Sequence, residues 1–214
     1  MNIPTITHGR VLVHDAEFAG PLLLLVGFHG YAQNADEMFA ELDAISGRSS
    51  WTVAAIQGLH RFYWRRSDIT VASWMTRQDR DPLIADNIGY VDAAITALAA
   101  GRPVEKLVLC GFSQGVAMAF RAGVRGPRRA DAIVALGGDV PPELLADRSI
   151  AFPRMVVARG TVDAFYTKER MDQDEAALRN RGGHVEAIRF DGGHEWHDSV
   201  RIALAALLTE LEGR

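Results

Sequence analysis

The sequence predicts an α/β protein with a mostly parallel central sheet that is covered by helices on both faces. Short apolar runs alternate with longer helical stretches along almost the whole chain, and this alternation is typical of parallel sheets. The run at residues 22–28 contains no polar residue, as expected for a strand that is buried on both faces. Because no repeat, low-complexity tract or linker interrupts the pattern, we expect one domain that spans residues 1–214.

Each predicted strand is a short run rich in Leu, Val, Ile or Ala. Pro21 opens the second of these runs, and the first is the shortest. The predicted strands are residues 11–13, 22–28, 52–56, 106–110, 132–136, 155–158 and 185–190.

The helices are predicted from the longer segments between the strands. In residues 84–98, apolar side chains recur at three- and four-residue spacing, which places them on one helix face. Residues 57–81 are polar and aromatic and are predicted to form a long loop. The predicted helices are residues 35–46, 84–98, 114–123, 168–181 and 198–211.

Composition and charge narrow the range of partners. The chain has 27 acidic and 23 basic residues and a net charge of −4, which argues against nucleic acid as a partner. The single cysteine, Cys110, excludes an internal disulfide and suits a reducing compartment. No apolar stretch approaches the ~20 residues of a membrane span, and no secretory signal is visible. We therefore expect a cytoplasmic protein without stable membrane insertion; the sequence leaves the oligomeric state open and is compatible with a homodimer.

The sequence Gly-Phe-Ser-Gln-Gly at residues 111–115 directly follows the apolar run 106–110. A G-x-S-x-G motif at a strand end is the sequence form of a sharp strand-to-helix turn that presents a serine hydroxyl. Residues 114–123 have helical composition, so Ser113 should lie at a helix N-terminus, where free N–H groups favour a developing negative charge. We expect Ser113 to be a catalytic nucleophile.

Two further residues with catalytic chemistry follow predicted strands. Asp163 comes soon after residues 155–158, and His194 follows residues 185–190. Active residues of parallel sheets gather beyond the C-terminal ends of the strands, and the chain order Ser, Asp, His is typical of one serine-hydrolase fold. A serine hydroxyl needs an adjacent base, so we expect His194 to be that base and Asp163 to orient it. Asp191 lies too near His194 in sequence to be preferred.

The turn His29-Gly30-Tyr31 follows the predicted strand at residues 22–28. Turns of this kind supply a backbone N–H to the oxyanion of a tetrahedral intermediate. We expect the N–H groups of Tyr31 and Gln114 to form the oxyanion hole. His29 is expected to position the turn rather than to titrate during catalysis.

No motif indicates a metal ion or a nucleotide cofactor. The segment His194-Glu195-Trp196-His197 departs from H-E-x-x-H because its fifth position is Asp198. The chain also contains no P-loop and no G-x-G-x-x-G. We expect no cofactor.

The catalytic motifs together resemble those of the phospholipase/carboxylesterase group of α/β-hydrolases, which includes bacterial carboxylesterases and acyl-protein thioesterases. The resemblance extends roughly over residues 21–211 and implies the α/β-hydrolase fold and a small-molecule ester substrate. It is carried by residues 29–31, 111–115, 160–163 and 193–195.

Aromatic residues near the predicted catalytic loops are candidates for the substrate pocket. Trp74 lies where members of this group carry a tryptophan near the acyl pocket, and Phe165 follows Asp163 in its predicted loop. We expect Trp74 and Phe165 to line the pocket, and Tyr166 to belong neither to the pocket nor to the core.

The predicted function is hydrolysis of carboxylic esters of short to medium acyl chain through an acyl-enzyme. A lysophospholipase, a thioesterase and a C–C or amide hydrolase are alternatives on the same fold. An alternative from another class is a catalytically silent relative that acts as a binding protein. Silent relatives lack at least one catalytic residue, whereas this chain has all three.

Access to the site is predicted from two segments. Residues 137–154, where related folds commonly insert a lid, are too few for a separate lid domain. The predicted loop 57–81 is rich in arginine, which argues against an apolar interfacial flap. We expect an open, shallow site.

Overall fold

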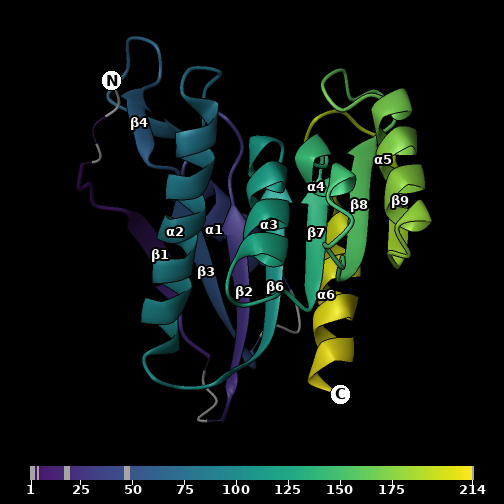
Figure 1. Ribbon diagram of the computed structural model, residues 1–214, viewed down its shortest axis with the longest axis horizontal. Helices are drawn as coiled ribbons and strands as arrows, with labels where there is room; N and C mark the ends of the chain where they lie inside the picture. Colours follow the sequence, from purple (N-terminus) through teal and green to yellow (C-terminus); the bar gives the residue numbers. More distant parts are fainter. Residues whose placement is uncertain (1–2, 4, 17–19, 46–48, 214) are drawn as a thin grey trace.

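The computed structural model describes residues 3, 5–16, 20–45 and 49–213, and a seven-stranded sheet forms its centre (Figure 1). The first strand of this sheet pairs antiparallel with its neighbour, and all other neighbours are parallel. In spatial order the strands are β1 (Arg10–His14), β3 (Trp51–Gln57), β2 (Leu22–Phe28), β6 (Val104–Phe112), β7 (Ala132–Leu136), β8 (Arg154–Gly160) and β9 (Val185–Phe190).

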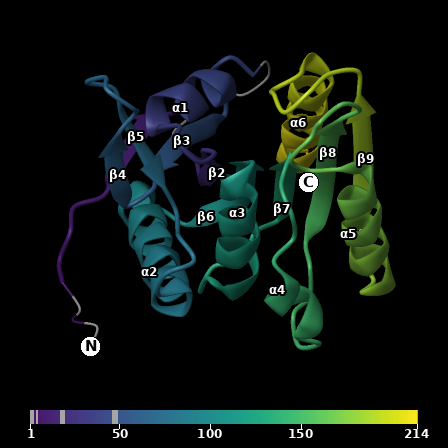
Figure 2. The same ribbon diagram turned by 90° about the horizontal axis from the view of Figure 1, so that it is seen from above.

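Helices cover both faces of the sheet (Figure 2). One face carries α1 (Ala35–Asp43) and α6 (Asp198–Glu212). The opposite face carries α2 (Arg80–Ala99), α3 (Gln114–Arg125), α4 (Pro142–Ala146) and α5 (Lys168–Asn180). A separate hydrophobic cluster fills the space between the sheet and each helical layer. The predicted fold class is therefore confirmed.

The predicted elements are present, with ends that differ by a few residues. The helix predicted from residue 84 begins at Arg80, and the helix predicted to reach residue 46 ends at Asp43; residue 46 itself lies outside the described residues. The strands β2, β7 and β9 have the predicted bounds, and the fifteen-residue helix α6 ends one residue later than predicted. None of the helices in the described part of the chain has the length and apolar character that crossing a bilayer requires.

The prediction of a continuous loop at residues 57–81 is wrong. This segment contains an antiparallel hairpin of β4 (His60–Tyr63) and β5 (Thr70–Ser73). Ala72 on β5 exchanges backbone hydrogen bonds with the turn after β2: its N–H donates to Gln33 O (2.8 Å), and its carbonyl accepts from Ala32 N–H (3.0 Å). The hairpin was missed because its strands are only four residues long and mix polar with aromatic and apolar residues, so they carry no clear alternation.

The five-residue helix α4 was also not predicted. Two consecutive prolines at its start read as a loop, but Pro142 occupies the first helical turn, where its missing N–H would have no intrahelical acceptor. Between β7 and β8 the chain forms α4 and irregular segments only.

Candidate active site

Ser113 occupies the sharp turn between β6 and α3. Its backbone has φ 53° and ψ −119°, a strained conformation for a residue that carries a Cβ atom. A Cβ atom at Gly111 would lie 2.5 Å from the Gly115 carbonyl oxygen, and one at Gly115 would lie 2.0 Å from the Phe28 carbonyl oxygen. Both glycines are therefore needed for the turn that presents the Ser113 side chain.

The His194 imidazole lies between the side chains of Ser113 and Asp163. Its Nε2 is 2.8 Å from Ser113 Oγ, and its Nδ1 is 2.8 Å from Asp163 Oδ2. A carboxylate can only accept hydrogen bonds, so the proton of the neutral imidazole is assigned to Nδ1, and Nε2 is left to accept from the Ser113 hydroxyl. The structure thus brings the three predicted catalytic side chains together, and the carboxylate at His194 is that of Asp163 rather than Asp191.

The loop between β8 and α5 fixes the Asp163 carboxylate. Its Oδ1 accepts hydrogen bonds from the backbone N–H groups of Phe165 (2.8 Å) and Tyr166 (3.0 Å), while Oδ2 faces His194. The Asp163 side chain is only 1% exposed. Because both oxygens have partners, the carboxylate is held in one orientation.

Two aromatic rings and a glycine surround the imidazole. The ring centroids of Phe112 and Phe165 lie 5.0 and 4.9 Å from that of His194. Gly137 has φ 67°, and a Cβ atom there would lie 3.1 Å from the imidazole. The His194 side chain keeps 18% of its surface exposed, so a substrate can reach it.

The turn after β2 lies against Ser113. A Cβ atom at Gly30 would be 3.2 Å from Ser113 Cβ, and the Gly30 N–H donates to Gln33 Oε1 (2.8 Å). Among the described residues, the N–H groups of Tyr31 and Gln114 have no hydrogen-bond acceptor. Neither of the two N–H groups predicted for the oxyanion hole is therefore already bound within the described residues.

His29 stabilises this turn through hydrogen bonds at both nitrogens of its imidazole. Its Nε2 accepts from Gly58 N–H (3.0 Å), which places the ring proton on Nδ1, and Nδ1 donates to Gly30 O (2.7 Å). Burial lowers the pKa of His29 to about 4, because the charged imidazolium would lose its hydration there. His29 is therefore neutral near pH 7.

A family model described as phospholipase/carboxylesterase matches residues 60–174, more than half of the 214 residues. The chain belongs to this family. The matched region contains Ser113 and Asp163. No curated protein sequence matches the chain significantly.

Solved structures of similar fold include several enzymes whose names agree with the phospholipase/carboxylesterase family. Esterase PE8 has a TM-score of 0.77 at 22% identity, with 96% of this chain and all of that chain covered. A phospholipase/carboxylesterase from Dyadobacter fermentans gives 0.71 at 15% identity, with 97% and 100% covered. Acyl-protein thioesterase 2 from Zea mays gives 0.67 at 17%, with 95% and 99% covered. These likenesses show that this family member has the α/β-hydrolase fold.

The assignment of Trp74 to the substrate pocket is wrong. The residue is completely buried, its ring packs against Phe28 and His29, and its indole Nε1 donates to His29 O (2.9 Å). A tryptophan directly after β5 fills the core because its large ring needs burial and its N–H finds an acceptor there. Trp74 thus stabilises the turn after β2 from within the hydrophobic core.

An open depression of about 300 Å³ lies beside Ser113. Phe165 lines it and is 72% exposed, as expected for a pocket residue. Tyr166 also belongs to its lining, although the residue is almost fully buried and its hydroxyl donates to Asp174 Oδ2 (3.0 Å). The expectation that Tyr166 lies outside both pocket and core is therefore wrong. At the rim, Arg170 pairs with Asp139 (3.0 Å).

The Gln114 side chain has a structural role that the sequence did not indicate. Its Oε1 accepts from Trp74 N–H (2.9 Å), and its Nε2 donates to Met75 O (3.0 Å). Gln114 thereby ties the start of α3 to the end of the hairpin. Only its position next to Ser113 could have drawn attention to it.

The candidate site contains no arrangement suited to a metal ion. In the described ranges, no three His, Cys, Asp or Glu side chains are grouped so that they could hold one. The acid–base pair that is present, His194 with Asp163, instead suits proton transfer at Ser113.

Proposed function

We propose that the chain is a serine carboxylesterase that hydrolyses esters of short to medium acyl chain through an acyl-enzyme on Ser113. The observation that carries this proposal is the continuous contact from Ser113 Oγ through His194 to Asp163, with 2.8 Å at each step. Membership of a carboxylesterase- and thioesterase-like hydrolase family supports it. No cofactor enters the proposed reaction.

In the first half of the reaction, Ser113 Oγ attacks the ester carbonyl carbon while His194 Nε2 takes the hydroxyl proton. The carbonyl oxygen becomes an oxyanion and accepts hydrogen bonds from the free N–H groups of Tyr31 and Gln114. His194 then gives its proton to the leaving alcohol. In the second half, a water molecule activated by His194 attacks the acyl-enzyme, and the acid is released.

The shape of the site favours small acyl groups. The depression beside Ser113 is open and holds about 300 Å³. No inserted domain lies between β7 and β8. Each additional CH₂ contributes about 0.8 kcal/mol only while there is apolar surface to cover it. We therefore propose that kcat/KM rises over short acyl chains and then levels or falls.

The decisive experiment for the mechanism is active-site labelling. A fluorophosphonate should add its mass to the tryptic peptide that contains Ser113. The Ser113→Ala variant, with the same thermal unfolding as the wild type, should neither label nor hydrolyse p-nitrophenyl acetate above background. Labelling that persists in this variant, or that maps to another peptide, would show that Ser113 is not the nucleophile.

The substrate class is tested by a rate series. p-Nitrophenyl esters of increasing acyl length should be compared with one thioester and one lysophospholipid of matched chain length. The proposal expects the short esters to be hydrolysed fastest and no rate jump at the critical micelle concentration. A preference for long chains together with interfacial activation would contradict it.

A further inference from the structure

A buried arginine lies directly beneath the loop that carries Asp163. Side chains alternate along β8, with Met155 and Val157 on the face covered by α5 and Val156 and Ala158 on the opposite face. Arg159 continues this alternation onto the α5 face. The residue is 5% exposed, which is rare for an arginine that lacks a compensating partner.

The partners of Arg159 are backbone carbonyl groups of the following loop. Its Nε donates to Tyr166 O (2.9 Å), and one terminal nitrogen donates to Thr161 O (3.2 Å) and Asp163 O (3.4 Å). Among the described residues, no carboxylate oxygen lies within 4 Å of this guanidinium, and the exposed carboxylate of Glu169 on α5 interacts with its charge only at longer range. The guanidinium therefore binds carbonyl groups at both ends of the loop, residues 161–166, and holds it in a compact shape.

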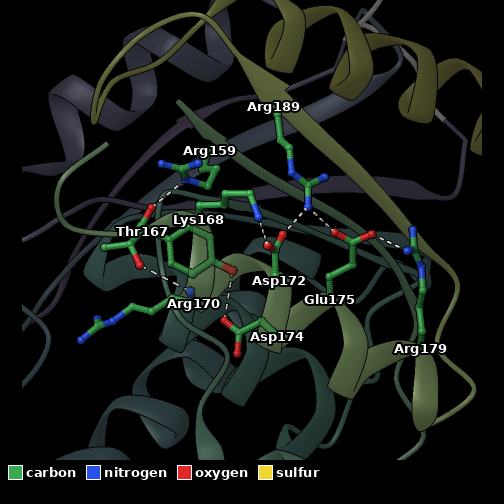
Figure 3. A network of polar contacts seen from close by, with 10 residues as sticks. Arg159, Thr167, Lys168, Arg170, Asp172, Asp174, Glu175, Arg179 and Arg189 are labelled. Atoms are coloured by element: carbon green, nitrogen blue, oxygen red, sulfur yellow. Dashed lines mark hydrogen bonds and ion pairs between the residues drawn. The ribbon is translucent and has the colours of Figure 1, made fainter. Parts of the chain in front are cut away.

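The neighbouring arginine on β9 is bound in a different way. Arg189 stands opposite Arg159 in the strand register, but its side chain donates to the carboxylates of Asp172 (2.8 Å) and Glu175 (2.7 Å) on α5. Figure 3 shows the Arg159 side chain directed to the start of α5 beside Thr167, whereas the Arg189 guanidinium faces Asp172 and Glu175. Arg189 thus holds a helix to a strand, whereas Arg159 organises a loop.

The opposite side of the same loop is fixed to the segment that carries His194. Thr161 N–H donates to Phe190 O (2.8 Å), and Val162 N–H donates to Gly192 O (3.0 Å). The loop is therefore attached to the histidine segment through its N–H groups and to Arg159 through its carbonyl groups. Asp163 lies between these two attachments.

We propose that Arg159 is a positioning residue that holds the Asp163 carboxylate against His194, an inference that rests on the proposed serine-esterase function. Without the guanidinium, buried carbonyl groups lose their donor, and the loop must move to reach water. A displacement of about 1 Å at a catalytic group can lower the rate about 10²-fold. Lysine is not equivalent, because its single ammonium does not reproduce the planar fork.

The test uses Arg159→Met and Arg159→Lys with a matched control. Arg181, at the other end of α5, also donates to backbone carbonyls, here of Asp147 (2.7 Å) and Ile150 (2.9 Å). We expect Arg159→Met to lower kcat about 10²-fold with KM within about threefold, and Arg159→Lys to lie between it and the wild type. Arg181→Met should keep kcat even where it lowers the melting temperature.

A double-mutant cycle distinguishes positioning from general destabilisation. If Arg159 acts through Asp163, then in an Asp163→Asn background Arg159→Met should lower the residual rate less than about threefold. Equal factors in both backgrounds, or wild-type kcat in folded Arg159→Met, would overturn the inference. If Arg159→Met does not fold, wild-type kcat in Arg159→Lys overturns it equally. Full activity of Asp163→Asn alone would instead refute the assignment of the acid in the proposed function.

Discussion

Two strand–turn–helix units carry the proposed nucleophile and the proposed acid, and they are built differently. The unit β6–α3 turns within one residue, and Ser113 is held by strained backbone and by the close approach of Gly111 and Gly115 to neighbouring carbonyl groups. The unit β8–α5 has a wider loop, and Asp163 is held by hydrogen bonds from its own loop and by the arrangement around Arg159.

The difference shows two ways to position a catalytic group. The first depends on glycine, because the absence of a Cβ atom at two positions lets the chain pass close to neighbouring backbone. The second depends on a side chain that satisfies backbone groups from the strand before the loop. A turn of the first kind is encoded in five consecutive residues, whereas a loop of the second kind depends on tertiary contacts.

The largest expected effect on catalysis comes from removing the proposed function of the Asp163 carboxylate while leaving the shape of its loop intact. Asp163→Asn keeps the side-chain volume, but its amide can present a donor to Nδ1 and so favour the wrong imidazole tautomer. We expect turnover to fall by up to about 10⁴-fold, as tautomer loss does in serine proteases. Steady-state kinetics with p-nitrophenyl acetate measures this, and Asp191→Asn is the matched control, which should stay near wild type. The reverse result would identify Asp191 as the orienting carboxylate.

The next largest effect concerns stability, and it comes from disrupting the strand-to-helix turn at Ser113. In Gly115→Ala, the new methyl group would meet the Phe28 carbonyl oxygen at 2.0 Å, and backbone cannot yield as a flexible side chain can. We expect the free energy of unfolding to fall by about 3 kcal/mol or more and the melting temperature by roughly 6–12 °C.

Gly89→Ala is the control for that change. Gly89 lies within α2, and a Cβ atom there would have no neighbour within 4 Å. This substitution should leave the protein unchanged or stabilise it by up to about 1 kcal/mol. Equal melting temperatures for wild type and Gly115→Ala in calorimetry would show that the strand-to-helix turn at Ser113 does not need a glycine at residue 115.

The same contrast explains which features could be predicted from the sequence. The sheet and the strand-to-helix turn at Ser113 were predictable because short apolar runs and G-x-S-x-G are local patterns. The β4–β5 hairpin was not, since its strands are short and receive part of their hydrogen bonding from the turn after β2. Trp74 was misassigned because a tryptophan beside a catalytic loop can face either the pocket or the core, and only the His29 carbonyl decides between them.

Arg159 and the Gln114 side chain gave no sequence signal as supporting residues for a related reason. Arginine at the end of a strand usually faces solvent, and only the folded loop places three carbonyl groups around its guanidinium. The carboxyamide of Gln114 likewise acquires its partners from the hairpin, far away in sequence. Supporting contacts of this type depend on tertiary structure, whereas the groups that they support follow strand ends.

The turn after β2 extends the comparison to a third region, where a buried neutral side chain supports the backbone. The pKa of His29 is lowered from 6.5 to about 4 in the folded state. Between these values the unfolded chain binds more protons, so stability falls as pH decreases through this window. Between pH 8 and pH 4.5 we expect a loss of about 2 to 3 kcal/mol from this residue.

Urea unfolding of the wild type and His29→Gln at both pH values isolates this loss. Glutamine does not titrate, so the variant should lack the His29 part of the pH dependence even if it is less stable at both pH values. The comparison between the two proteins cancels other groups that titrate in the same range. Parallel pH profiles for wild type and variant would show that His29 does not change its protonation on unfolding.

The smallest expected effect concerns Phe165, whose backbone and ring have separate roles in the loop that carries Asp163. Phe165 donates its backbone N–H to Asp163, while its ring is exposed, lines the depression and lies 4.9 Å from the His194 ring. Phe165→Ala keeps the backbone donor and removes only the ring. We expect KM for p-nitrophenyl butyrate to rise roughly three- to tenfold with kcat nearly unchanged, because the ring contributes about 1 kcal/mol of uniform binding. A lower kcat at constant KM would instead mean that the ring orients His194, and the acid loop would then position both members of the catalytic pair.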